Sequence, residues 1–404
     1  MWWTAALWAL LAWQSNFYTD GVKALNEKRY PDAVKDFTNA VAAEPNDYTA
    51  HFNLALAYSL TGQNTEAAAE YRKTLELKPG LYQAQLNLGI VLLHLNQPAA
   101  AKDPLAAAVA AKPQDYRANY FLGDALLKAG DAAGAGRAFT AAVAAQPNSA
   151  AAELGLGRAL AQENKLDEAA PHFHKAASLD PHYHDSLLEL AQRYEAAKRY
   201  AEAAALYGEF PNDPAAVEHR GEMLMAGGDA AAAVQQFEQV VAQSPTDANR
   251  AALADAYLAN KQSAKALPLI EDLLQRDPNN YQLQMLSAGI LRDQRNFKAA
   301  AEAYGRAAQL RENEPKAWTG LAEMLLLLDD YTGTLNALDR VRALKAETPG
   351  HMFLRSIALD KMHDLKPALA SYKEFLAASQ GKFPDEEFKA RQRVRIIQDQ
   401  LNHR

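Results

Sequence analysis

The sequence predicts an all-α protein built as a solenoid of stacked helical hairpins. The main observation is a period of 34 residues that places a proline at Pro45, Pro79, Pro113, Pro147 and Pro181. An alanine lies twelve residues before each of these prolines, a bulky apolar residue eight before and a small residue 24 before. A fixed period of roughly 20–50 residues is the signature of a repeat architecture, so we expect one array of repeats instead of unrelated domains.

The repeated positions explain how each hairpin packs. The small residues are Gly21, Ala55, Gly89, Gly123 and Gly157, the alanines are Ala33, Ala67, Ala101, Ala135 and Ala169, and the bulky residues are Phe37, Tyr71, Leu105, Phe139 and Phe173. Small side chains let two helices approach closely, and a larger one would cost about 1–3 kcal/mol through overpacking. Glycines such as Gly62 and Gly130 suit the turn inside the hairpin. The proline ends the second helix, because it lacks an N–H group and disfavours helix in the residue before it.

The segment from Tyr48 to Gly80 resembles a tetratricopeptide repeat (TPR), because it carries the family's Leu-Gly/Ala-x-x-Tyr, alanine, aromatic and proline positions. The resemblance implies a right-handed superhelical solenoid of about eleven helix-turn-helix units. Their predicted starts are Gln14, Tyr48, Tyr82, Tyr116, Ala150, His184, Pro214, Asp247, Tyr281, Pro315 and Pro349.

The predicted organisation has four parts, namely a leader at 1–13, units one to six at 14–213, units seven to eleven at 214–382 and a C-terminal capping helix within 383–404, from about Asp385 to Leu401. The unit that begins at His184 is only 30 residues long and ends in two prolines, Pro211 and Pro214. We therefore expect the course of the solenoid to change near residue 212.

Composition excludes several kinds of function. The net charge is −7, with 42 Lys+Arg and 49 Asp+Glu, so the basic stripe of a nucleic-acid binder is missing. With no cysteine, disulfides and thiolate sites are excluded. No phosphate loop or hydrolase motif is present, and His172 and His174 would lie on different sides of a helix. We expect no catalytic residue, metal site or cofactor.

The first thirteen residues, from Met1 to Trp13, are uncharged and hold four of the five tryptophans. They are too few to span a bilayer as a helix and resemble the apolar core of a bacterial signal peptide, with Ala12 as a cleavage position. This predicts an exported, periplasmic or secreted protein with no stable membrane insertion after cleavage. The alternative is an apolar helix that seals the end of the fold, in a cytoplasmic protein.

In TPR proteins the first helices of the units form a concave wall, and the resemblance implies candidate peptide-binding residues there: Tyr18, Phe52, Asn53, Asn87, Arg117, Tyr120 and Phe121. Two interpretations remain, because such aromatic residues could grip an extended peptide or pack between units. A carboxylate clamp, which some family members use for a C-terminal carboxylate, is not matched, since Phe52, Leu56 and Phe121 occupy three of its polar positions.

Further along, the same wall becomes acidic, with Glu189, Glu218, Glu222 and Asp255 as candidate binding residues. They could attract a basic segment or could form a solvated helix face. The predicted function is a non-enzymatic TPR scaffold that binds an extended peptide or partner protein with apolar and basic parts. The alternatives are an accessory substrate-binding arm for a separate enzyme and a self-assembling structural protein of the cell envelope.

Overall fold

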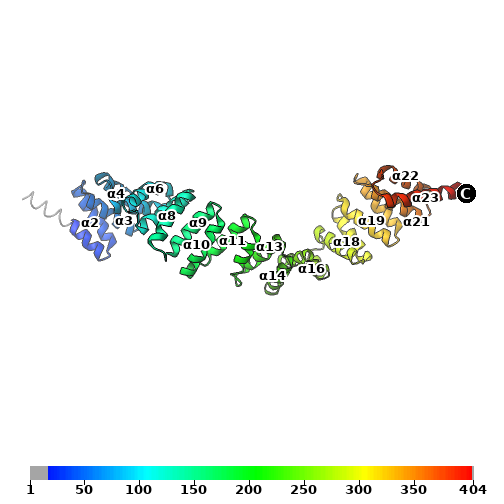
Figure 1. The fold of residues 1–404 in the computed structure, drawn as a ribbon, viewed down its shortest axis with the longest axis horizontal. Coiled ribbons are helices and arrows are strands. Elements are labelled where there is room, and N and C mark those ends of the chain that lie inside the picture. The colour runs from blue at the N-terminus through cyan, green and yellow to red at the C-terminus, as the bar shows by residue number, and fades with distance from the viewer. Residues whose placement is uncertain (1–16, 403–404) are drawn as a thin grey trace, which may run out of the picture. The chain divides into compact units, whose positions relative to one another are not determined.

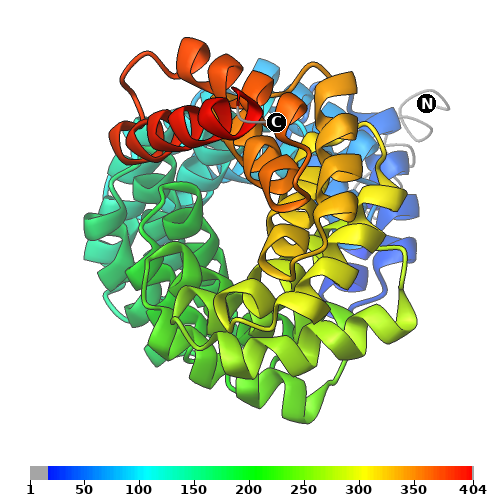
Figure 2. The ribbon, with the colours of Figure 1, turned by 90° about the vertical axis from the view of Figure 1, so that its right-hand side faces the viewer.

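The computed structural model describes residues 17–402, and all regular secondary structure in this range is helical. The predicted leader lies outside these residues. The chain divides into two compact units. Unit 1 ends at Glu209, and unit 2 begins at Phe210. This division falls in the loop that carries Pro211, four residues before the predicted boundary at Pro214. Figures 1 and 2 show helical hairpins stacked side by side within each unit.

Unit 1 contains hairpins whose helices alternate along the chain. Residues 17–26 form its first described helix. The first helices of the following hairpins are α3 (Tyr48–Leu60), α5 (Tyr82–His94), α7 (Tyr116–Lys128), α9 (Ala150–Gln162) and α11 (Ser186–Ala196). The second helices are α2 (Tyr30–Ala43), α4 (Asn64–Leu77), α6 (Pro98–Ala111), α8 (Ala132–Ala145), α10 (Leu166–Leu179) and α12 (Tyr200–Tyr207).

Unit 2 continues the same alternation. Its first helices are α13 (Pro214–Ala226), α15 (Asp247–Ala259), α17 (Tyr281–Asp293), α19 (Pro315–Leu327) and α21 (Pro349–Lys361). Its second helices are α14 (Ala230–Gln243), α16 (Ser263–Arg276), α18 (Phe297–Leu310), α20 (Tyr331–Ala343) and α22 (Leu365–Ser379). The chain then forms the predicted last helix, α23 (Pro384–Asn402), which packs on α22.

Nine of the predicted unit starts coincide with the first residue of a helix. The exception among the described starts is His184, because the short 3-10 helix η1 (Pro181–Tyr183) precedes α11, which begins at Ser186. The second helix of this hairpin, α12, has 8 residues, whereas α4 has 14. The shortened unit that the sequence predicts is therefore present, and its loss lies mainly in the second helix.

The small residues stand where two helices of a hairpin meet. A Cβ atom added at Gly89 would lie 2.3 Å from Leu105, and one added at Gly123 would lie 2.9 Å from Phe139. The alanines of the second helices, such as Ala67 and Ala101, are fully buried. The prediction that small side chains mark the close contacts is confirmed. Gly62 and Gly130, with φ values of 76° and 86°, form the turns that the sequence indicates.

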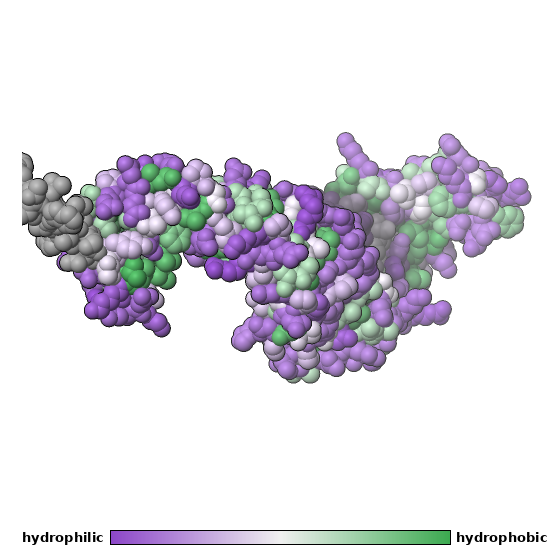
Figure 3. Space-filling view, turned by 60° about the vertical axis from the view of Figure 1, so that its left-hand side comes forward, coloured by the Kyte–Doolittle hydropathy of each residue, from purple (hydrophilic) through white to green (hydrophobic). Residues whose placement is uncertain are grey.

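Buried polar side chains join several of the first helices to the loop before them. Asn119 Nδ2 donates to the Pro113 carbonyl at 2.8 Å, and Gln284 Nε2 donates to the Pro278 carbonyl at 3.0 Å. Both side chains are buried. Since an unpaired backbone carbonyl is costly inside a protein, these amides fix the connection between consecutive hairpins. The face in Figure 3 is mainly hydrophilic, and the fully buried large side chains, such as Phe37 and Tyr71, are apolar or aromatic.

Candidate binding surfaces between first helices

The first helices of unit 1 follow one another along a continuous surface. Helix α5 contacts α7, α7 contacts α9, and α9 contacts α11. The second helices α4, α6, α8 and α10 each pack between their own first helix and the next, as α4 does between α3 and α5. We call the surface that the first helices form the first-helix wall. It carries the predicted binding residues of this unit.

The predicted aromatic residues pack inside their own hairpins. Each ring meets the bulky residue of the second helix, 19 positions later, edge to face. The ring centroids are 5.8 Å apart for Tyr18 and Phe37, 5.7 Å for Phe52 and Tyr71, and 5.9 Å for Tyr120 and Phe139. All three first-helix residues are half-buried, so each also presents part of its surface. Packing thus accounts for much of this aromatic stripe, and peptide binding there stays a prediction.

The predicted asparagines connect neighbouring hairpins. Asn53 Nδ2 donates to the Tyr18 hydroxyl at 2.9 Å, and Asn87 Nδ2 donates to the Tyr71 hydroxyl at 3.2 Å. These amide donors are therefore engaged with the protein itself. Of the remaining predicted residues, Phe121 is half-buried and its ring centroid lies 5.3 Å from that of Tyr120, while Arg117 is exposed.

The predicted acidic residues belong to both units. Glu189 of unit 1 forms an ion pair with Arg158 Nη2 at 2.8 Å. Sequence reasoning considered the units from His184 onward and so missed this arginine, which extends from α9. In unit 2, Glu222 lies 3.3 Å from His219 Nδ1, and Glu218 is exposed. The ion pair lowers the net negative charge near Glu189, so the acidic character is stronger in unit 2.

Asp255 borders a pocket of about 420 Å³ between α15 and α17, which make few direct contacts with each other. We call it the α15–α17 pocket. Its lining is otherwise mainly apolar and consists of Ala251, Ala254, Ile270, Gln282, Leu283, Met285 and Leu286. Burial raises the pKa of the Asp255 carboxyl group above its ordinary value. A cation that entered the pocket would favour the charged carboxylate.

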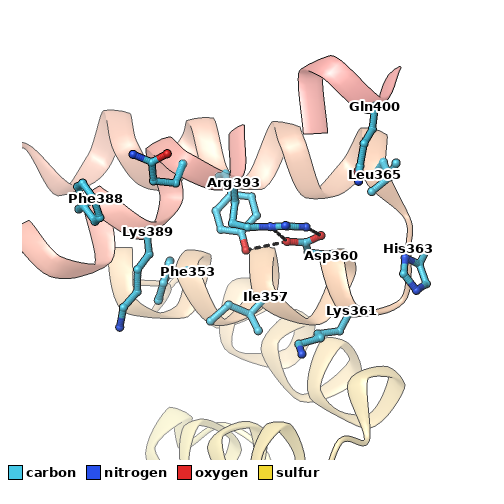
Figure 4. Close-up of a pocket in the computed structure, with 12 residues that line it drawn as sticks. Phe353, Ile357, Asp360, Lys361, His363, Leu365, Phe388, Lys389, Arg393 and Gln400 are labelled. Carbon is cyan, nitrogen blue, oxygen red and sulfur yellow. Dashed lines mark hydrogen bonds and ion pairs between the residues drawn. The ribbon is translucent and has the colours of Figure 1, made fainter. Parts of the chain in front are cut away.

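A second pocket, of about 740 Å³, lies between α21 and α23 over α22 (Figure 4). We call it the α21–α23 pocket. Arg393 of α23 donates to both carboxylate oxygens of Asp360 of α21, at 2.7 and 2.6 Å, and the Tyr372 hydroxyl donates to the same group at 3.2 Å. The sequence analysis assigned no binding role to these residues. Of the three, only Arg393 lies within the predicted capping helix, and Asp360 and Tyr372 come from the hairpin before it.

Within residues 17–402, no group of three or more His, Asp or Glu side chains is arranged to hold a metal ion. Nδ1 of His172 lies 2.6 Å from the buried carboxylate of Glu153. In the same range no helix combines the length and the apolar composition that crossing a bilayer requires.

Comparison with solved structures finds similar chains, each of which this chain matches over less than half of its own length. The MamA protein is 23% identical, with 42% of this chain and 92% of that chain covered and a TM-score of 0.40. MamA from Desulfovibrio magneticus RS-1, residues 41 to the end, is 26% identical, with 42% and 95% covered and a TM-score of 0.40. YrrB, described as a TPR protein with an unusual peptide-binding site, is 25% identical, with 47% and 95% covered and a TM-score of 0.39.

No curated protein matches the chain. Two family models, both described as tetratricopeptide repeat, match most of it. One matches residues 18–82, 86–150, 122–184 and 288–351, and the other matches residues 160–216 and 224–290. These matches agree with the helical hairpins of both units, and the chain belongs to the tetratricopeptide repeat family.

Proposed function

We propose that this protein is a non-enzymatic TPR scaffold that binds an extended segment of a partner protein along its first helices. Membership in the family supports a general protein-binding role. The observation that carries the finer proposal is the α15–α17 pocket, which combines an apolar lining with one carboxylate, Asp255. In this proposal an apolar side chain of the partner enters the pocket and a neighbouring lysine or arginine pairs with Asp255.

The chemistry of the pocket supports a ligand with these two parts. Its volume of about 420 Å³ falls in the range of ordinary binding pockets, about 300–1,000 Å³. The Ile270 side chain is fully buried beneath it, and Met285 and Leu286 border it. Contact with the apolar lining raises the pKa of the Asp255 carboxyl group, while the residue keeps enough exposed surface for a partner to reach it. A cationic side chain of the partner would favour the charged carboxylate.

Glu218 and Glu222 extend the acidic character of unit 2. They lie four residues apart on α13, on one side of the helix, and both are exposed. Exposed charges of one sign speed the encounter with an oppositely charged segment more than they hold it. We therefore assign Glu218 and Glu222 to the attraction of the basic segment and the α15–α17 pocket to its retention.

The proposal is tested with a short fluorescent peptide that contains leucine and phenylalanine flanked by lysines. Asp255→Asn removes the charge of the pocket, and Ala251→Phe fills the pocket without changing its charge. Each is expected to weaken binding to the full-length protein about tenfold, because a charge pair at the edge of an apolar pocket and an apolar anchor within it each contribute about 1.4 kcal/mol. Glu271→Gln, an exposed carboxylate on α16 outside the pocket, is the control and is expected to bind the peptide as the wild type does.

Kinetics separate attraction from retention. Changing Glu218 and Glu222 together to glutamine is expected to slow association at low salt and to have less effect at high salt, where charges are screened over about 8 Å or less. Ala251→Phe is expected to speed dissociation at both salt concentrations. If Asp255→Asn and Ala251→Phe bind the peptide as tightly as Glu271→Gln does, the α15–α17 pocket is not the binding site.

A further inference from the structure

We infer that the α21–α23 pocket is a second peptide-binding site, and that it takes an acidic segment with an apolar side chain from a partner protein. This site is distinct from the α15–α17 pocket, which has the opposite charge. The inference depends on the charge of the pocket, on its exposed apolar residues and on the contacts that hold the pocket in place.

The pocket is positively charged within an acidic protein. The charged groups that line it, with histidine counted as neutral, are Asp360, Lys361, Lys389 and Arg393. Arg393 neutralises the charge of Asp360, and together with the Tyr372 hydroxyl it engages both oxygens of this carboxylate. The two lysines are exposed, and they leave an excess of positive charge in a chain whose net charge is −7. A carboxylate-bearing segment complements this charge.

The apolar part of the pocket lies between the two lysines. In Figure 4, Phe353 and Ile357 of α21 lie between the side chains of Lys361 and Lys389. Phe388 of α23 also lines the pocket, and 63% of its surface is exposed. A large exposed aromatic residue beside a concave surface is typical of a binding site. A ligand that carries only negative charge would leave these groups uncovered.

The pocket is held in shape by the core on either side. The Phe353 ring packs against Phe375, with centroids 4.9 Å apart, and against Tyr372, at 6.3 Å. On α23, Ala390 and Ile397 are fully buried within the apolar cluster that α22 shares. The ion pair of Arg393 with Asp360 connects α23 to α21. Because both walls are fixed, binding requires little ordering of the protein.

The helix α23 occupies the position of a first helix of another repeat. It packs on α22 as α5 packs on α4, and the pocket lies between α21 and α23 as the other pocket lies between α15 and α17. The capping helix thus has two surfaces. One covers the apolar side of α22, and the other, with Phe388, Lys389 and Gln392, forms a wall of the pocket.

The test uses the full-length protein and a short fluorescent peptide of leucine and phenylalanine flanked by aspartates and glutamates. The double variant Lys361→Glu with Lys389→Glu reverses the charge of the pocket. The control double variant, Lys366→Glu with Lys373→Glu, makes the same change in net charge at exposed positions of α22 that do not line the pocket. We expect the first to weaken binding about tenfold or more and the second to change it less than about twofold.

The apolar part is tested with Phe388→Ala and with a second peptide that keeps its acidic residues but has serines in place of leucine and phenylalanine. Phe388→Ala is expected to weaken binding of the first peptide about threefold or more. The serine peptide is expected to bind much more weakly than the first. Circular dichroism of each variant checks that the helices are retained.

Three results would overturn the inference. The first is that the wild type does not bind the acidic peptide at concentrations up to about 1 mM, the weak end of specific recognition. The second is that the two lysine double variants lose binding of the acidic peptide equally. The third is that the wild type binds the serine peptide as tightly as the peptide with leucine and phenylalanine. Asp255→Asn keeps this test separate from that of the proposed function. It should leave the affinity for the acidic peptide unchanged, whereas it should weaken binding of the basic peptide.

Discussion

Gly89 offers a direct test of how the hairpins pack. It lies in α5, where an added Cβ atom would be 2.3 Å from Cγ of Leu105 and 2.6 Å from its Cδ2. Carbon atoms pack best at about 3.5–4.0 Å, so in Gly89→Ala the two helices or the Leu105 side chain must move by about 1.2–1.7 Å. Leu105 is fully buried, which leaves it little space to move into.

The expected free-energy change has two opposing terms. Overpacking costs about 1–3 kcal/mol, and replacement of glycine by alanine within a helix stabilises by about 0.5–1 kcal/mol. The two terms leave a net cost between about 0 and 2.5 kcal/mol. Because the added Cβ atom would lie only 2.3 Å from a fully buried side chain, we expect Gly89→Ala to destabilise the hairpin of α5 and α6 by about 1–2 kcal/mol, in the upper part of that range. The effect at Gly123 should be smaller, since its nearest neighbour is the Phe139 ring at 2.9 Å, and a ring can tilt.

Gly289 provides a matched control, because it also lies in the first helix of a hairpin. It lies in α17, and an added Cβ atom would have no neighbour within 4 Å. Only the helix term applies there, so Gly289→Ala is expected to stabilise by about 0.5–1 kcal/mol. The same substitution should thus have opposite signs at the two positions.

Hydrogen exchange measured by mass spectrometry resolves these effects hairpin by hairpin. A destabilisation of about 1–2 kcal/mol corresponds to about 5–30-fold faster exchange of protected amides. We expect this in α5 and α6 of Gly89→Ala, with little change in unit 2, because each repeat contacts only its neighbours. Unchanged or slower exchange in α5 would refute the packing argument. A uniform loss of protection along the chain would refute the independence of the repeats.

Three further predictions concern the capping helix α23, the α15–α17 pocket and the leader. Arg393→Met should speed hydrogen exchange in α23 and leave exchange in unit 1 unchanged. The loss of stability should be about 1–2 kcal/mol, which is less than for a fully buried ion pair, because 39% of the Arg393 side chain is exposed. The pKa of Asp255 is raised in the folded protein, so the contribution of this residue to stability is present at low pH and is lost as the pH rises through that pKa. Calorimetry at neutral pH should therefore give a higher Tm for Asp255→Asn than for the wild type. The leader predicts that the mature protein from its source cell begins after about Ala12, and mass spectra with an intact Met1 would argue against export.

The sequence was sufficient to predict the repeats because their determinants are local and recur. Proline, glycine and alanine positions with a period of 34 residues mark the helix ends and the close contacts, and Tyr48, Tyr82 and Tyr116 each begin a first helix as predicted. The last helix, predicted from Asp385 to Leu401, extends over Pro384–Asn402. These features depend on residues within one hairpin, so one sequence carries enough information.

The pockets could not be predicted in the same way, because they depend on contacts between hairpins. Glu189 is acidic in the sequence, yet Arg158, 31 residues earlier, pairs with it. Asp360 and Arg393 are separated by 33 residues and meet only when α23 packs on the last hairpin. Which charges are neutralised depends on which side chains of neighbouring hairpins meet, and the repeat pattern does not specify those contacts.

The α15–α17 pocket nevertheless has a cause that can be traced to one position. The fifth residue of three units in the first half of the chain is aromatic, namely Tyr18, Phe52 and Tyr120. Each of these rings covers the residue 19 positions later. The equivalent residue of α15 is Ala251, and the residue 19 positions later is Ile270, which lies at the pocket. An alanine cannot fill the volume of an aromatic ring, and the neighbouring first helix does not close the gap. The space left by this one small side chain therefore accounts for the α15–α17 pocket, whereas the α21–α23 pocket forms beside an aromatic fifth residue, Phe353, where α23 takes the place of the next first helix.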